Sequence, residues 1–218
     1  EANEKIFDLD HLGIKRFFNL DANTYKDGIL PADPVGPNTG ALLSATHHIG
    51  TMDTTRGILI GRFQPFHEGH MRVVGDIIDE VDELVLGIGS ADASHEPRNP
   101  FTAGERIMMI QNTLASLETT TYVVPLDDMD RNSVWVSHVE SMSPWFDVAY
   151  SNNPLVIRLF REDGIDVHQT EMFDRENLKG SEIRELMARD GDWEQFVPDA
   201  VVEVVEEVDG ISRIDAIR

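Results

Sequence analysis

From residue 56 onward, apolar and polar positions alternate in regular blocks along the chain. Short apolar runs, typical of strands that are buried on both faces of a sheet, are separated by segments with apolar residues at helical spacing. Strands are predicted over residues 57–61, 84–88, 122–124 and 148–150. Strands that alternate with helices form a parallel sheet through right-handed crossovers, so the pattern predicts an α/β fold.

Helices are predicted between these strands and after the last of them. Thr102 and Glu105 form a capping box, in which two side chains satisfy free amides at the start of a helix. The predicted helices cover residues 74–81, the segment that begins at Thr102, residues 134–140, the segment after Pro154, and residues 181–188 and 200–208. Glu105 and Arg106 are interpreted mainly as structural residues, a cap and a charge on the helix face.

Two loops follow predicted strands directly, Gly61-Arg62 after the first and Gly89-Ser90 after the second. In open parallel sheets, ligands bind beyond the carboxyl ends of the strands, where the strand order reverses. The sequence therefore predicts that these two loops share one cleft.

The first 51 residues lack this alternation. Glycine and proline recur between Asp21 and Gly40, a pattern typical of a loop or linker. We therefore interpret residues 1–51 as a leader or linker outside the catalytic fold, and residues 52–218 as the catalytic domain.

The charge balance argues against nucleic acid as a partner. The chain has 40 acidic and 18 basic residues and a net charge of −22, and residues 52–218 alone carry 33 acids against 13 arginines and one lysine, a net charge of −19. Such a field repels phosphate backbones, which excludes nucleic acid, and it suits a high-salt cytoplasm because salt screens the self-repulsion. No apolar run approaches the roughly 20 residues that cross a bilayer, so we expect no membrane association and a cytoplasmic location.

Other side chains limit the chemistry. The chain has no cysteine, which excludes disulfides, thiolate metal sites and a cysteine nucleophile. Asp127, Asp128 and Asp130 form an acidic cluster, but in so acidic a chain such a cluster is typical of solvated surface. No metal-ligating residue is therefore predicted.

His67 and His70 are three residues apart, directly after a predicted strand and at the predicted start of a helix. This spacing places both imidazoles on one helix face, and the free amides of a helix start favour phosphate at the same place. A His-x-x-His pair alone also fits surface or metal-binding histidines. Because Gly-Arg-Phe-Gln-Pro-Phe precedes it after a buried strand, we favour a site for a polyphosphate.

A second phosphate motif is predicted at Ser181 and Arg184. Their spacing places a hydroxyl and a guanidinium on one helix face, near its start. Arginine can clamp phosphate oxygens through two parallel hydrogen bonds and keeps its charge at any relevant pH. Spacing alone would equally fit a capping serine and a solvated arginine, but beside the first motif phosphate binding is favoured.

Together these segments resemble the nucleotidylyltransferase superfamily that has a His-x-x-His signature, and within it the archaeal type of nicotinamide mononucleotide adenylyltransferase. The resemblance extends from about Arg56 to Arg213. It rests on Gly61 to His70, Gly89-Ser90-Ala91, Arg98 to Arg106, Asn153-Pro154-Leu155, and Lys179 to Arg184, where Lys179-Gly180 departs from the commoner small residues. It implies a Rossmann-like, doubly wound parallel sheet with a helical C-terminal region.

The resemblance also implies an activity: transfer of the adenylyl group of ATP to nicotinamide mononucleotide, giving NAD and pyrophosphate. His67, His70 and Arg184 would then be the catalytic residues. The residues implied to bind ATP are Gly61, Arg62, Phe63, His67, His70, Ser181 and Arg184. Mg²⁺ would be bound mainly through substrate phosphates, because it usually keeps several waters. The family also suggests a homo-oligomer, with a hexamer as one candidate.

For the mononucleotide, the resemblance implies contacts from four residues. Arg98 would meet its phosphate, Ser90 and Asn132 the nicotinamide side, and Trp135 would stack on the pyridine ring, whose positive charge suits an indole face. A tryptophan at helical spacing is more often a core residue, and that alternative stays open for Trp135.

Two other functions are carried as alternatives. One is another adenylyl- or cytidylyltransferase of the same superfamily, against which Arg98 and Trp135 argue. The other is a catalytically silent nucleotide-binding protein, against which the intact His67, His70 and Arg184 argue.

Overall fold

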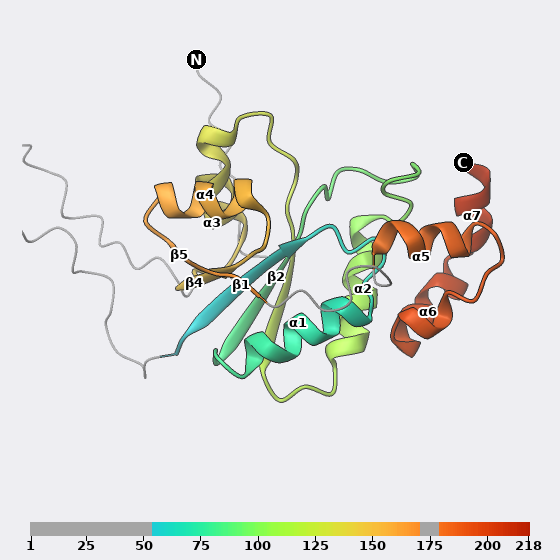
Figure 1. The fold of residues 1–218 in the computed structure, drawn as a ribbon, viewed down its shortest axis with the longest axis horizontal. Helices are drawn as coiled ribbons and strands as arrows, with labels where there is room; N and C mark the ends of the chain where they lie inside the picture. Colours follow the sequence, from blue (N-terminus) through green and yellow to red (C-terminus); the bar gives the residue numbers. More distant parts are fainter. Residues whose placement is uncertain (1–53, 171–178) are drawn as a thin grey trace, which may run out of the picture. The chain divides into compact units, whose positions relative to one another are not determined.

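A computed structural model describes residues 54–170 and 179–218, so the predicted leader over residues 1–51 lies outside the described residues. Five parallel strands form one sheet in the order β3-β2-β1-β4-β5 (Figure 1). The strands are β1 (Arg56–Gly61), β2 (Glu83–Ile88), β3 (Thr120–Pro125), β4 (Val148–Tyr150) and β5 (Asp166–His168). The predicted α/β fold with a parallel sheet is confirmed.

Helices cover both faces of this sheet. They are α1 (Glu68–Ile78), α2 (Ala103–Leu114), η2 (Asn132–Val134), α3 (Trp135–Met142), α4 (Pro154–Glu162), α5 (Gly180–Met187), η3 (Glu194–Phe196), α6 (Asp199–Glu207) and α7 (Gly210–Ala216). In Figure 1, α3 and α4 lie on one side of the strands, and α1, α2 and the C-terminal helices lie on the other.

The strands divide their side chains between two apolar clusters, as the two-residue period of a strand requires. Leu84 and Leu86 of β2 belong to the cluster beneath α1, α2, α5 and α6. Val85, between them, belongs to the cluster beneath α3 and α4, together with Ile58 and Ala149. Helices on both faces explain why the strand sequences are apolar runs rather than alternating ones.

The sequence-based prediction missed β5 and α7, as well as the short 3-10 helices η2 and η3. Only Val167 is buried in β5, an edge strand, so its apolar signal is a single residue. Asp209 has the left-handed backbone angles φ 52° and ψ 44°, which separate α6 from α7 without a glycine or proline between them. Val81 was predicted to belong to α1 but lies beyond its end, where it is still 7% exposed.

Two features of the sheet matter for the site. The strand order reverses at β1, which lies between β2 and β4, and the amide of Gly89 donates a hydrogen bond of 2.9 Å to the carbonyl oxygen of Gly61. The two loops predicted to share a cleft are therefore joined directly. Among the described residues, no helix is both long and apolar enough to span a membrane.

Candidate active site

His67 and His70 lie at the start of α1, where His67 is the N-cap and His70 is in the first turn. Their imidazole rings stack with centroids 3.6 Å apart and planes 24° apart. The His70 ring also packs against Phe63, at 4.9 Å, and Phe66, at 5.4 Å. The predicted placement of both imidazoles on one face is thus what the structure shows, and the aromatic packing fixes their orientation.

Both histidines are held neutral. Burial lowers the pKa of His67 to about 4. Burial, with a smaller contribution from His67, holds the pKa of His70 well below its usual range. The Nδ1 atom of His70 accepts a hydrogen bond of 3.2 Å from the amide of His67, so the neutral ring carries its proton on Nε2. His70 therefore offers an N–H donor rather than a positive charge.

Arg184, on α5, lies across the site from the histidines. Its Nη1 donates to the carbonyl oxygen of Gln64 at 2.6 Å, and its Nε donates to that of Pro97 at 3.2 Å. Burial and then the charges of Arg62 and Arg98 lower the pKa of Arg184. A group of arginines so close together in a strongly acidic chain forms a local field that favours an anion.

One cavity of about 330 Å³ lies between these groups. It is lined by Arg62, Phe63, Gln64, Pro65, His67, His70, Lys179, Gly180, Ser181 and Arg184. Six of the seven residues that the sequence analysis assigned to ATP therefore line one space. The seventh, Gly61, precedes Arg62 at the end of β1, and a Cβ atom there would lie 2.9 Å from the Phe63 ring. The start of α1 and the start of α5 both open onto this cavity, which provides amide donors for phosphate oxygens.

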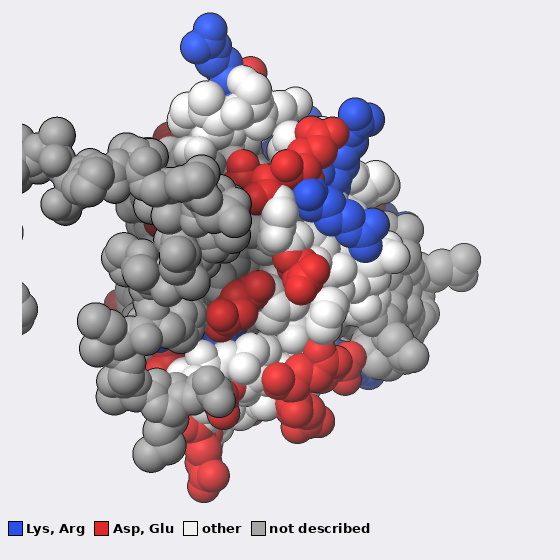
Figure 2. Space-filling view, turned by 90° about the vertical axis from the view of Figure 1, so that its left-hand side faces the viewer, with Lys and Arg blue, Asp and Glu red and all other residues white. Residues whose placement is uncertain are grey.

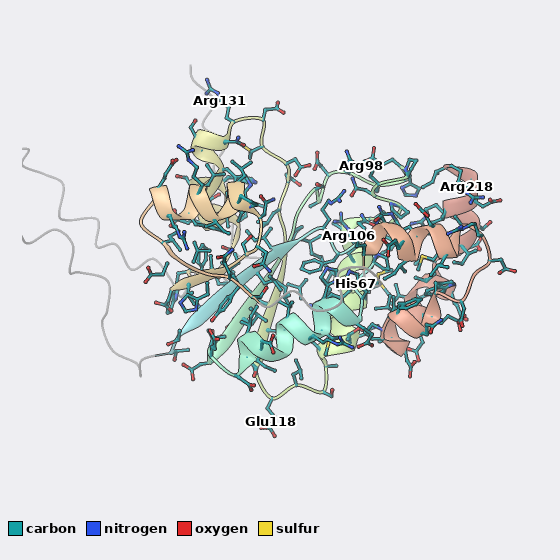
Figure 3. The ribbon with its side chains drawn as sticks, in the orientation of Figure 1. His67, Arg98, Arg106, Glu118, Arg131 and Arg218 are labelled. Atoms are coloured by element: carbon teal, nitrogen blue, oxygen red, sulfur yellow. The ribbon has the colours of Figure 1, made fainter. Side chains whose placement is uncertain are left out.

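The residues assigned to the mononucleotide lie elsewhere and do not line this cavity. Ser90 is 9% exposed with φ 49°, and Arg98 is exposed on the loop before α2. Trp135 begins α3 and packs edge-on against Phe160 with centroids 5.2 Å apart, so it is partly a core residue. In Figure 3, Arg131, the neighbour of Asn132, lies well away from His67 and Arg106.

Gln64 and Arg106 hold the site together through contacts that the sequence analysis did not predict. The side chain of Gln64, 4% exposed, exchanges two hydrogen bonds with the backbone of Phe101, of 2.8 and 3.0 Å. Arg106, interpreted from the sequence as a charge on the helix face, is 0% exposed. Three of its hydrogen bonds go to backbone carbonyls of the two strand-end loops. Both residues lie within motif segments, but only tertiary contacts reveal that their side chains point inward.

No group of three or more His, Cys, Asp and Glu side chains within residues 54–170 and 179–218 could hold a metal ion. The cavity instead presents arginine, lysine and neutral histidine. This donor set fits a divalent ion that arrives bound to phosphate oxygens.

Comparison with known proteins identifies the family. The profile of the cytidylyltransferase-like family matches residues 58–186. Three proteins named nicotinamide-nucleotide adenylyltransferase are closely similar. That of Haloarcula marismortui is 65% identical over 159 residues, 73% of this chain and 85% of the relative, and that of Halobacterium salinarum is 63% identical over 160 residues, 73% and 90%. That of Methanolobus tindarius is 56% identical over 162 residues, 74% and 94%.

This chain belongs to the nicotinamide-nucleotide adenylyltransferase family. The resemblance stated from its motifs is thereby confirmed, and the predicted adaptation to high salt agrees with the Halobacterium salinarum relative.

A solved structure shows the same fold at lower sequence identity. It is a bifunctional NMN adenylyltransferase/ADP ribose pyrophosphatase from Francisella tularensis, complexed with AMP and a Mn ion. The TM-score is 0.61 at 21% identity, over 75% of this chain and 52% of that one. The present chain thus spans about half the length of that bifunctional protein. At this identity the match shows the fold alone, which is the Rossmann-like sheet expected of the nicotinamide-nucleotide adenylyltransferase family.

Proposed function

We propose that this chain transfers the adenylyl group of ATP to nicotinamide mononucleotide, releasing pyrophosphate and making NAD. The observation that carries the proposal is the cavity of about 330 Å³ in which His67, His70, Ser181 and Arg184 meet at the starts of α1 and α5. Membership of the nicotinamide-nucleotide adenylyltransferase family supports the choice of acceptor.

The reaction needs no covalent enzyme nucleophile, because the mononucleotide's phosphate is already one. One of its oxygens attacks the α-phosphorus of ATP. The bond from that phosphorus to the oxygen bridging to the β-phosphate breaks, and pyrophosphate leaves with the bonding electrons. The work left for the protein is to hold both substrates in line and to stabilise charge on the leaving group.

The triphosphate would lie in the cavity. His70 would donate from Nε2, and Arg184 from Nη2, because its Nη1 and Nε already bond to Gln64 and Pro97. Ser181 would add a hydroxyl, and Arg62 a second positive charge at the mouth. Neutral imidazoles are suited to this task since they donate hydrogen bonds without the cost of burying another unpaired charge.

Arg98 would hold the acceptor phosphate. Its charge acts on Arg184 strongly enough to contribute to the lowered pKa of that residue. Two arginines that close repel each other, so a phosphate from each substrate between them would relieve the repulsion. Ser90, Asn132 and Trp135 would bind the nicotinamide side of the mononucleotide.

We propose Mg²⁺ as the divalent ion, bound by phosphate oxygens and water. It would neutralise charge on the triphosphate. The protein's part is the arginine and helix-start donors on the remaining phosphate oxygens. A homo-oligomer stays a prediction from the family resemblance.

The proposal is tested by incubating the purified protein with ATP, Mg²⁺ and nicotinamide mononucleotide at low and at molar KCl, and identifying the products by mass. NAD and pyrophosphate are expected in equal amounts. Parallel incubations replace the acceptor with FMN or phosphopantetheine, or ATP with CTP. If a product forms in one of those incubations but NAD does not form, the chain is another transferase of the superfamily. If no product forms under any condition, the chain is a catalytically silent nucleotide-binding protein.

A further inference from the structure

Arg106 is the largest fully buried side chain in the described residues and none of its partners is a carboxylate. Its guanidinium donates to four backbone carbonyl oxygens. They are those of Thr102, from Nε at 3.2 Å, of Arg62 and Gly89, from Nη1 at 2.9 and 2.8 Å, and of Ser90, from Nη2 at 2.9 Å. Within residues 54–170 and 179–218, no Asp or Glu oxygen lies within ion-pair distance of it.

Two other arginines that are at least partly buried pair with acids. A third, the half-buried Arg184, donates to backbone carbonyls. Arg56, at the start of β1, forms an ion pair with Glu83. Arg213, on α7, forms two hydrogen bonds to the carboxylate of Glu105, of 2.6 and 2.9 Å. Burying a cation without such a partner is unfavourable, and protein interiors avoid it unless its hydrogen bonds are satisfied by other groups. Arg106 therefore differs from Arg56 and Arg213, because backbone carbonyls rather than a carboxylate accept the hydrogen bonds of its guanidinium.

Three of these four carbonyls belong to the loops assigned to the substrates. Arg62 follows β1 and lines the triphosphate cavity, and Gly89 and Ser90 follow β2 on the side assigned to the mononucleotide. Both loops leave their strands through left-handed residues, Phe63 and Ser90, each with φ 49°. Non-glycine residues keep such angles only where surrounding contacts fix them. In the described structure, Arg106 is a side chain that contacts both loops at once.

The charge of Arg106 has a second consequence. Burial, and then the charge of Arg62, lower its pKa to about 10, so it stays protonated at neutral pH. Asp92, Asp128 and Glu105 act on it only at longer range. A fixed positive charge thus lies against the two loops, and in Figure 3 Arg106 is labelled between Arg98 and His67. Preorganised charges of this kind favour a transition state in which negative charge moves to a leaving group.

We propose that Arg106 is a positioning residue for adenylyl transfer: by binding the carbonyls of both strand-end loops, it sets the ATP loop and the mononucleotide loop at the spacing that in-line transfer needs. This inference rests on the proposed function. A positioning role for Arg106 differs from a purely structural role in one measurable respect. A structural arginine affects how much protein is folded, whereas a positioning arginine affects the turnover of protein that is folded.

The first test is Arg106→Lys, with Arg56→Lys as the matched control at the opposite end of β1. Lysine keeps the charge, but its single nitrogen cannot reach carbonyls on both sides as a planar guanidinium does. Small misplacements of reacting groups cost on the order of 10²-fold in rate. We expect Arg106→Lys to lower kcat by roughly 10- to 100-fold while the Kd for ATP changes much less, and Arg56→Lys to leave kcat unchanged.

A readout independent of activity accompanies the kinetics. Hydrogen–deuterium exchange should rise in peptides that contain residues 61–64 and 89–91 in Arg106→Lys, and should not rise there in Arg56→Lys. Arg106→Ala leaves a cavity of guanidinium size, so millimolar guanidinium chloride should restore part of its turnover, whereas equal KCl should not. If Arg106→Ala does not fold, the kcat and the hydrogen–deuterium exchange of Arg106→Lys test the positioning role without it.

The outcomes distinguish a failure of the proposed function from a failure of the positioning role. If the unmodified protein forms no NAD, the proposed function fails. If it forms NAD, and folded Arg106→Lys has the same kcat and the same exchange in both loops, the positioning role is wrong. A loss of activity that only follows the loss of folded protein, with guanidinium giving no recovery, would also overturn it.

Discussion

The guanidinium of Arg184 donates a 2.6 Å hydrogen bond to the carbonyl oxygen of Gln64, a residue 120 positions earlier in the chain. This bond ties α5 to the turn that carries His67 and His70. The same side chain reaches Pro97, beside Arg98. Arg184 therefore connects the predicted ATP motif to the predicted acceptor loop.

Arg184 and Arg98 are expected to differ kinetically. Arg184→Ala removes a donor to the leaving pyrophosphate, so it should lower kcat more than it raises the KM for nicotinamide mononucleotide. Arg98→Ala should mainly raise that KM, because the acceptor phosphate must be bound before reaction. Each substitution should cost about 2 to 4 kcal/mol of transition-state stabilisation, typical for removal of a charge-stabilising donor. Steady-state kinetics with each substrate varied separately checks this, and swapped phenotypes would mean that the two subsites are reversed.

The stability of the fold should depend on His67 below neutral pH. Its pKa is about 4 in the folded protein, below the 6.5 of a free imidazole. Between these values the unfolded chain binds more protons, so the free energy of unfolding falls as pH decreases from 6.5 to 4. The loss due to His67 should approach about 3 kcal/mol at pH 4. Denaturant unfolding of the unmodified protein and His67→Asn, at fixed KCl, should show a shallower fall for the variant.

The control is Gln111→Asn, an exposed change on α2 that removes no titratable group. Its pH profile should run parallel to that of the unmodified protein. Parallel profiles for all three proteins would show that His67 does not become buried and neutral on folding.

Substitution of Trp135 distinguishes a role in stacking on the pyridine ring from a role in core packing. If its indole stacks on the pyridine ring, Trp135→Leu removes about 0.5 to 2 kcal/mol of binding free energy. The KM for nicotinamide mononucleotide should rise accordingly, with kcat little changed. Val136→Ala, a buried change in the same helix, should lower the melting temperature and leave that KM unchanged. Should Trp135→Leu behave like Val136→Ala, the contact with Phe160 is the whole role of Trp135.

Molar KCl should stabilise the protein. The net charge of −19 on residues 52–218 produces self-repulsion that 1 M salt screens within about 3 Å. Figure 2 shows several groups of carboxylates among uncharged residues on the face in view. The melting temperature and kcat should both rise as KCl increases from 0.1 to 1 M, and glycerol, which adds no ions, should not reproduce the rise in kcat. A melting temperature that falls steadily with KCl would contradict the role of screening.

Removal of residues 1–51 should leave catalysis intact, because every matched motif lies after them and glycine and proline recur within them. The shortened protein should form NAD with unchanged kcat and KM. A large loss of kcat, with an unchanged circular dichroism spectrum and melting temperature, would show that the segment belongs to the catalytic unit.

The sequence by itself determined the parallel α/β architecture, the helix start at His67, the capping box at Thr102 and the helix that carries Ser181 and Arg184 near its start. These features are local, because apolar period, cap chemistry and residue spacing act within a few turns of chain. The edge strand β5 and helix α7 were missed for the same reason. Each is short, and its place depends on the sheet and on α2 rather than on its own period.

Only the tertiary structure decided which residues hold the site together. Gln64 and Arg106 are polar side chains that a sequence pattern assigns to the surface, yet they are buried because backbone groups 37 and 16 to 44 positions away satisfy them. The neutrality of His67 and His70 also comes from burial, which no spacing encodes. Local sequence specifies which donors are present, whereas long-range packing sets their direction, their protonation and the distance between the two loops that carry them.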